Sequence, residues 1–246
     1  MLPYAARTLN RGKVCGVRPS GVARLGPMSD MERFRRAVVE WAAGGAGASA
    51  AGESARELAV GVGLRTVVLV EGGSDQAAVE TLAARRGRDL DSEGVSVVPL
   101  GGATSVGRFV DLCGPQGLGV RLAGLCDVGE ERFFRRALER AGLGSDIPPE
   151  GLEPLGFYVC DVDLEDELIR SLGVEVVQQV VVDQGESRPF RTFRNQPAQR
   201  ERTVEQQLRR FLGTHSGRKA QYARGMVESL DLERTPRPLE RLLAHV

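Results

Sequence analysis

The stretch that decides the fold reads Arg-Thr-Val-Val-Leu-Val-Glu-Gly-Gly-Ser-Asp, from Arg65 to Asp75. Residues 66–70 are apolar or β-branched throughout, which is typical of a strand buried on both faces. The strand ends on a carboxylate, Glu71, and a helical pattern of small apolar residues begins at Ala77. Open parallel sheets bind ligands at the carboxyl ends of their strands, so Glu71 stands where a ligand is expected.

Strands and helices alternate downstream of this strand. Further strands are predicted at 95–99, 120–126 and 156–160, and helices at 75–86, 104–113, 130–141 and 164–172. This alternation indicates βαβ units with right-handed crossovers. We therefore expect an α/β protein with a Rossmann-like fold, in which helices flank a central, mostly parallel four-stranded sheet.

The flanking segments have weaker patterns. Residues 1–30 lack hydrophobic periodicity and are expected to form a disordered tail, with a start-site artefact or a transit peptide as alternatives. Residues 31–64 are expected to hold an amphipathic helix at 31–43, a small-residue linker at 44–52 and a short helix at 54–60. The main α/β domain is predicted to span 65–173.

A mainly helical extension is predicted for residues 174–246. Its first part, 174–182, is rich in β-prone valine. This part is expected to add an edge strand, to pair with another subunit in a homodimer, or to serve as plain core. Residues 183–200 are polar, and helices are predicted at 203–212 and 217–230.

Composition excludes some classes of protein and leaves others open. The chain holds 33 basic and 33 acidic residues, so only local patches can argue for nucleic-acid binding. It holds two histidines, and its four cysteines form no Cys-x-x-Cys pair, which disfavours a zinc site. No apolar run reaches the roughly 20 residues of a membrane span. Cys126 and Cys160 end apolar runs and are expected to be buried, reduced thiols, which favours a cytoplasmic protein without membrane contact.

Acidic residues follow three of the four predicted strands. The carboxyl ends of parallel strands meet at one edge, and strands lie ~4.8 Å apart, so these acids come within reach of shared ions. Oxygen ligands without cysteine or histidine suit Mg²⁺ or Mn²⁺. The acids concerned are Glu71 and Asp75 after the first strand, Asp127, Glu130 and Glu131 after the third, and Asp161, Asp163, Glu165, Asp166 and Glu167 after the fourth.

These acids also have a structural alternative. Asp127-x-x-Glu130 and Asp163-x-x-Asp166 resemble capping boxes, and Ser74 or Asp75 could be a helix N-cap. Glu71 has no obvious helix to cap. The coincidence of acids after three strands favours a metal site.

Phosphate-binding candidates come from two kinds of segment. Gly101-Gly102-Ala103-Thr104 could present backbone N–H groups to phosphate at a helix start, or could form a close-packed turn. Arg218 and Lys219 open a predicted helix, where the macrodipole disfavours cations, so a phosphate-neutralising role competes with a solvated basic face. Seven further arginines lie nearby, at 188, 191, 194, 200, 202, 209 and 210. The candidates for binding phosphate are Gly72, Gly73, Gly102, Thr104, Ser216 and Arg218.

Residues 65–173 resemble a TOPRIM domain, the metal-binding fold shared by type IA and II topoisomerases, bacterial primases and OLD-family nucleases. The family pattern is a Glu after the first strand, which Val-Glu-Gly at 70–72 supplies, and an Asp-x-Asp motif after the third. Three features are most similar to the OLD (overcoming lysogenization defect) branch. They are Val-Glu-Gly-x-Ser-Asp, Asp-Leu-Glu-Asp-Glu-Leu at 163–168, and Ser-Gly-Arg-Lys-Ala with Lys219.

The resemblance implies roles for individual residues. Glu71 and Asp75 would bind one metal, and Asp127 and Glu131 would correspond to the first and third acids of an Asp-x-Asp-x-acid motif. The cluster would be completed by Asp161, Asp163, Glu165 or Glu167, of which Glu165 is preferred. Lys219 would stabilise the transition-state phosphate, so Glu71, Asp127 and Lys219 would carry catalysis. Gly129 replaces the middle acid of the motif, so either Glu130 or Glu131 compensates or one ion site is lost.

The function implied is Mg²⁺- or Mn²⁺-dependent cleavage of DNA by an OLD-like endonuclease. No Walker motif is present, so the resemblance implies a stand-alone domain whose ATPase partner, if any, is a separate chain. Two alternatives stay open. One is a catalytically degenerate nucleic-acid-binding or regulatory module, which Gly129 favours. The other is a nucleotidyl transferase or hydrolase acting on a small phosphate ester.

Overall fold

The computed structural model describes residues 28–144, 151–214 and 217–246. Four strands form one sheet in the order β2-β1-β3-β4, and every neighbouring pair is parallel. The strands are β1 (Thr66–Val70), β2 (Val95–Pro99), β3 (Arg121–Asp127) and β4 (Phe157–Cys160). The predicted α/β class with a parallel four-stranded sheet is confirmed.

The central position of β1 explains its sequence. All five of its residues are buried, because helices cover both faces of the sheet. Alternate side chains enter different cores: Val68 and Val70 belong to one, and Val67 and Leu69 to the other. Since β1 and β3 are neighbours, Glu71, which follows β1, and Asp127, the last residue of β3, lie close together at the carboxyl edge.

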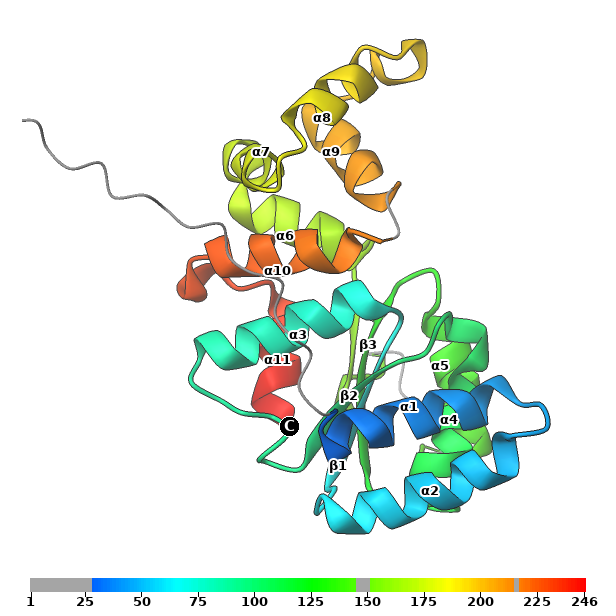
Figure 1. Ribbon diagram of the computed structural model, residues 1–246. Helices are drawn as coiled ribbons and strands as arrows, with labels where there is room; N and C mark the ends of the chain where they lie inside the picture. Colours follow the sequence, from blue (N-terminus) through cyan, green and yellow to red (C-terminus); the bar gives the residue numbers. More distant parts are fainter. Residues whose placement is uncertain (1–27, 145–150, 215–216) are drawn as a thin grey trace, which may run out of the picture.

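Two layers of helices enclose the sheet (Figure 1). One layer contains α1 (Asp30–Ala43), α2 (Ala48–Gly61), α4 (Val106–Cys113) and α5 (Glu131–Arg140). The other contains α3 (Gly73–Arg85), α6 (Leu164–Leu172), α10 (Lys219–Ser229) and α11 (Arg237–His245). Beyond α6 and α10 lie α7 (Val174–Asp183), α8 (Ser187–Arg194) and α9 (Val204–Gly213).

The linker predicted at 44–52 is largely wrong, because α2 begins at Ala48. Alanine has the highest helix propensity, and it supplies much of the first turn. Gly52 lets the two helices approach closely, since a Cβ there would lie 2.7 Å from Cδ1 of Trp41 on α1. Small residues in this stretch therefore serve helix packing.

The edge strand considered for 174–182 is also wrong, because this segment is helix α7. Its valines at 177, 180 and 181 follow helical spacing and are buried. Packing of this apolar face outweighs the β propensity of valine. The polar segment 183–200 likewise contains a helix, α8, whose Phe190 packs against Phe211.

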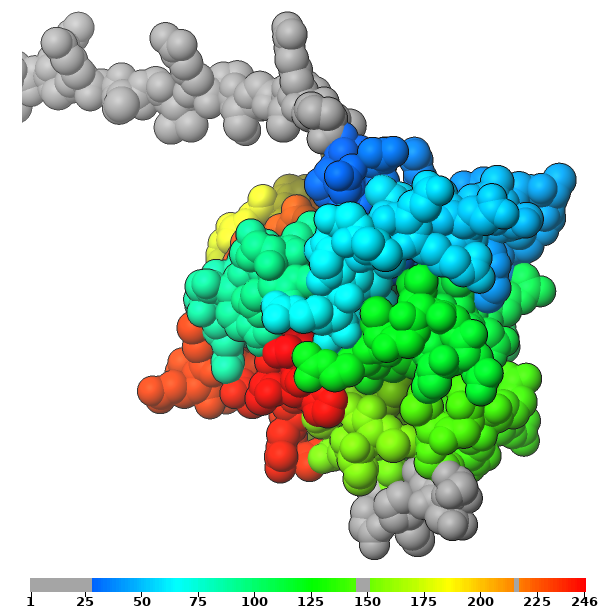
Figure 2. Space-filling model, turned by 90° about the horizontal axis from the view of Figure 1, so that it is seen from below, coloured from blue at the N-terminus to red at the C-terminus, as the bar shows by residue number. Residues whose placement is uncertain are grey.

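The chain returns to the sheet at its C-terminal end. Helix α10 packs against α3. Arg85 of α3 donates hydrogen bonds to the carbonyl oxygens of Val227 (2.7 Å) and Leu230 (2.6 Å) at the C-terminal end of α10, and so holds the two helices together. Helix α11 packs against β3 and β4. In the space-filling view the C-terminal residues (red) lie against green and cyan segments of the α/β core (Figure 2). The packing of α10 against α3 brings Lys219 next to the start of α3.

Three cysteines, Cys113, Cys126 and Cys160, are buried and unpaired, as expected for the last two. Within the described ranges, no helix is long and apolar enough to cross a bilayer. The tail predicted for residues 1–30 falls almost entirely on 1–27, which lie outside the described residues.

Candidate active site

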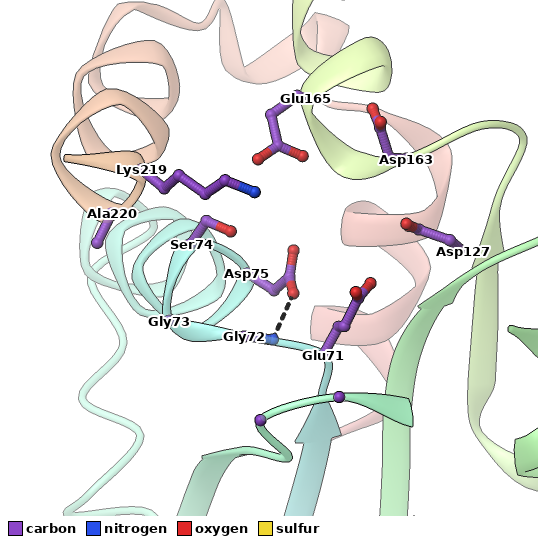
Figure 3. A pocket seen from close by; sticks show the side chains of 12 residues that line it. Glu71, Gly72, Gly73, Ser74, Asp75, Asp127, Asp163, Glu165, Lys219 and Ala220 are labelled. Atoms are coloured by element: carbon purple, nitrogen blue, oxygen red, sulfur yellow. Dashed lines mark hydrogen bonds between the residues drawn. The ribbon is translucent and has the colours of Figure 1, made fainter. Parts of the chain in front are cut away.

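A cavity of about 400 Å³ opens at the carboxyl edge of the sheet. Five carboxylates and one ammonium group line it, and Lys219 extends from the start of α10 toward Glu165 and Asp75 (Figure 3). The lining residues are Glu71, Gly72, Gly73, Ser74, Asp75, Gly101, Gly102, Asp127, Asp163, Glu165, Lys219 and Ala220. The fold thus gathers acids from three strand ends, with a lysine from the C-terminal extension.

Glu71 and Asp127 form the middle of the acid group. Glu71 follows β1, Asp127 ends β3, and both side chains are only partly exposed. Burial raises the pKa of Asp127 to about 8, and the negative charges of Glu71, Asp75 and Asp163 act in the same direction. A neighbouring cation would relieve this repulsion.

Asp75 lies at the third position of α3. Its Oδ2 accepts a hydrogen bond from the Gly72 N–H at 2.9 Å. Gly72 is the N-cap, so the predicted cap at Ser74 or Asp75 is wrong. The backbone bond favours the charged form of Asp75, but burial outweighs it and raises the pKa of Asp75 to about 7.

Asp163 and Glu165 reach the cavity from α6. Asp163 is the N-cap of α6, since its side chain accepts from the Asp166 N–H at 2.8 Å, which is one half of the predicted capping box. The Asp166 side chain instead pairs with Arg170 at 2.9 Å. It also accepts from Nε of Arg209 at 2.7 Å. Burial raises the pKa of Glu165, and Lys219 partly offsets that effect. Asp163 therefore caps α6 and also lines the cavity.

Several predicted site residues lie outside the cavity. Asp161 points to solvent and pairs with Arg170 at 3.3 Å, and Glu131 pairs with Arg135 at 2.7 Å. Arg218 forms an ion pair with Glu186 of the loop before α8. Thr104 lines a different cavity beside α5, and Ser216 lies outside the described residues. Asp161, Glu131 and Arg218 are thus engaged in ion pairs outside the acidic cavity.

Glu130 does not line the cavity but interacts with Glu71, and the sequence indicates it only as a substitute for the missing motif acid. The other acid of the predicted capping box, Asp127, does not cap α5, which begins at Glu131 without a side-chain cap. Burial and the charge of Glu71 raise the pKa of Glu130 to about 7. Its Oε2 is buried and has no hydrogen-bond partner within the described structure. The sequence feature that indicates Glu130 is its position next to Gly129, where the family motif has an acid.

The donor set fits a divalent metal ion. It consists of oxygen ligands only, which suits Mg²⁺ or Mn²⁺. Burial and mutual repulsion raise the pKa of Asp75, Asp127 and Glu130 to about 7 or 8, so a bound cation would displace the protons that these carboxyl groups hold. The orphaned Glu130 Oε2 is a buried acceptor of the kind that a cation satisfies. In the described ranges, no group of three or more acidic, histidine or cysteine side chains is close enough together to hold a metal ion as it stands. An open site of few carboxylates leaves coordination positions for water and phosphate oxygens.

Comparison with known proteins identifies the class. Residues 64–128 match the family model described as Overcoming lysogenization defect protein-like, TOPRIM domain. The C-terminal region of the Xanthomonas campestris pv. campestris OLD protein superposes with a TM-score of 0.57 at 25% identity, over 74% of this chain and 92% of that chain. The C-terminal region of the Burkholderia pseudomallei OLD protein superposes with a TM-score of 0.56 at 21% identity, over 74% and 96%. No curated protein sequence matches the chain.

The parallel sheet with acids at its carboxyl edge therefore has a TOPRIM-like fold, and TOPRIM domains in general bind divalent metal ions. More particularly, residues 64–128 match an OLD-like TOPRIM domain, and the predicted resemblance is confirmed. The chain departs from the Asp-x-Asp motif at position 129, where a glycine replaces the middle acid.

Proposed function

We propose that this protein is a Mg²⁺- or Mn²⁺-dependent endonuclease that hydrolyses phosphodiester bonds in DNA. The observation that carries the proposal is the meeting of acids from three strand ends with Lys219 in one open cavity. A nuclease needs ligands for an ion and a fixed positive charge for phosphate, and this cavity offers both. A nucleic-acid-related role is the coarser function that the OLD-like TOPRIM domain supports.

The residues that line the cavity would have separate roles. Glu71, Asp75 and Asp127 would hold the ion, with Glu165 and Asp163 on the far side of the cavity. A divalent ion bound there would activate a water and neutralise charge on the phosphate. The Lys219 ammonium would pair with a non-bridging phosphate oxygen as negative charge develops. Gly72 and Gly73 have open space at their Cβ positions, so a phosphate can approach their backbone.

The alternative that an observation favours is a module that binds nucleic acid without cleaving it. Gly129 supplies no ligand, and Lys219 alone cannot activate water. The two proposals differ in metal-dependent turnover. A hydrolase of small phosphate esters would also turn over with metal, but it would leave polynucleotides intact.

The test is incubation of purified protein with supercoiled plasmid in Mg²⁺, Mn²⁺ or EDTA, with an RNA substrate in parallel. We expect nicking or linearisation with metal, none with EDTA, and a loss of at least about 100-fold in Glu71→Ala, on the scale of removing one key group in an active site. The matched control is Glu131→Ala, which removes an acid outside the cavity and should cleave normally.

Circular dichroism of Glu71→Ala should match the wild type, which separates loss of chemistry from unfolding. Undiminished cleavage by Glu71→Ala contradicts the proposed function. No cleavage by the wild-type protein with either metal favours the binding module or dependence on an ATPase partner.

A further inference from the structure

A second, basic cavity adjoins the acidic one. It encloses about 340 Å³, and its lining residues are Asp163, Arg202, Gln206, Arg209 and Arg210. Asp163 lines both cavities, so they meet at this residue. A chain-like molecule seated in the acidic cavity could therefore continue into the basic one.

The basic cavity is built on one face of α9 and on the turn that precedes it. Gln206, Arg209 and Arg210 lie on α9 at spacings of three and four residues, which puts their side chains on one side of the helix. Arg202 lies in the turn, just before the N-cap Thr203. The start of α9 is fixed by a capping box between Thr203 and Gln206. Its opposite face is anchored by buried Leu208, Phe211 and Leu212. The arginines are thus presented from a fixed element.

Only one of the three arginines has a structural ion pair. Arg209 binds Asp163 through Nε at 2.7 Å and through its terminal nitrogen at 2.5 Å. Arg202 and Arg210 are exposed, and neither forms an ion pair with a carboxylate of the described residues; Nε of Arg202 donates to the Ala198 carbonyl at 3.2 Å, which leaves its charge unneutralised. Glu201 and Glu205, the nearby acids in sequence, do not line the cavity. With three positive charges against Asp163, the cavity keeps two unneutralised guanidinium groups.

We propose that Arg202 and Arg210 bind phosphates of the nucleic-acid strand next to the bond held in the acidic cavity. This inference rests on the proposed function and names how the same site holds its substrate. A guanidinium group donates two parallel hydrogen bonds to a phosphate, which makes arginine well suited to backbone contacts. Gln206, between them, adds a neutral donor. The Arg209 guanidinium group is already paired with the Asp163 carboxylate, so Arg209 acts as a positioning residue for Asp163.

The test measures binding apart from cleavage. Fluorescence anisotropy with labelled single-stranded and duplex DNA and RNA is recorded in EDTA, over a series of salt concentrations. We expect Arg202→Ala/Arg210→Ala to weaken binding by about 10-fold or more and to lower the slope of log K against log salt by about 2, one for each lost phosphate contact. Arg202→Lys/Arg210→Lys should recover part of the affinity, since it keeps the charge.

The matched control is Arg36→Ala/Arg56→Ala, which removes the same charge from exposed positions on α1 and α2, at the opposite side of the molecule (Figure 1). It should bind like the wild type. Equal losses in both double variants, no loss in Arg202→Ala/Arg210→Ala, or a wild-type protein that binds none of the four nucleic acids would each overturn the inference. Intact binding without metal-dependent cleavage would contradict the proposed function alone.

Discussion

Glu130 shows how a single residue can differ from its sequence motif. The motif acid is missing at 129, and the neighbouring Glu130 places a buried, unpartnered oxygen beside Glu71. Glu131, one residue on, instead forms a surface ion pair with Arg135. Two adjacent glutamates therefore have different expected roles.

We expect Glu130→Gln to weaken Mn²⁺ binding by about 10-fold, the scale seen when a residue supporting a metal site is removed. Glutamine keeps the shape of the glutamate side chain but carries no negative charge, so it attracts a cation less strongly. Isothermal titration calorimetry with MnCl₂ gives the affinity, and Glu131→Gln is the control with unchanged binding. Wild-type affinity in Glu130→Gln would show that Glu130 takes no part in the site.

The acids also predict a pH dependence of stability in the metal-free protein. The pKa of Asp127 is about 8 in the folded chain, against an ordinary value of 3.8. Between these values the folded chain holds a proton that the unfolded chain has released, so the free energy of unfolding falls as pH rises.

We therefore expect the thermal midpoint in EDTA to be higher at pH 6 than at pH 8, with Asp75 adding to the effect through its pKa of about 7. Asp127→Asn should reduce the difference, because it removes the titrating group. Added Mg²⁺ should stabilise the protein more at pH 8 than at pH 6. Differential scanning fluorimetry measures both, and a midpoint that rises with pH over this range would refute the account.

Prediction of where single residues lie was correct where backbone topology decides the position, while the roles given to these residues stay predictions. Glu71, Asp75, Asp127, Asp163 and Glu165 all line one cavity, because parallel strands put their carboxyl ends at one edge. It failed where a distant partner decides the orientation. Arg218 turns to Glu186, an acid 32 positions earlier whose burial no local pattern indicates. Lys219, the next residue, faces the acids.

At the scale of elements, strands were easier to predict than the C-terminal helices. The four predicted strands match the observed ones within about one residue, since buried β-branched runs between helical patterns leave little choice. For α7, the valine-rich sequence allowed both a strand and a helix. Packing against α6, α9 and α10 selects the helix, and the contacts with α9 and α10 depend on segments 20 or more residues further along the chain.

Gly124 is required by the contact between β3 and its neighbours. A Cβ there would lie 2.7 Å from the Leu69 carbonyl oxygen and 2.6 Å from the Phe157 ring. Because backbone on β1 cannot move aside cheaply, we expect Gly124→Ala to reduce the free energy of unfolding by about 1–3 kcal/mol. Urea unfolding measures this change.

The control for Gly124 is Gly61→Ala, at the end of α2, where the added methyl group meets no atom within 4 Å. It should leave stability unchanged or raise it by up to about 1 kcal/mol, because alanine suits a helix better than glycine does. Equal stability of the two variants would contradict the packing described for β3.

At the scale of the whole molecule, the C-terminal extension completes both the core and the cavity. Leu239, Leu242 and Leu243 of α11 share one hydrophobic cluster with Val68 and Val70 of β1. The same return of the chain brings Lys219 to the acids. The sequence predicted helices there, but it gave no indication that they pack on the sheet, because apolar helical faces do not specify their partner.

The most direct test of the account is to soak crystals of the protein in MnCl₂ and compute an anomalous difference map. We predict a peak in the cavity between Glu71, Asp75 and Asp127, on the side facing Lys219, and its absence in crystals of Glu71→Ala. A map with no peak in this cavity, or with manganese only at other sites, would contradict the claim that these acids form a metal centre.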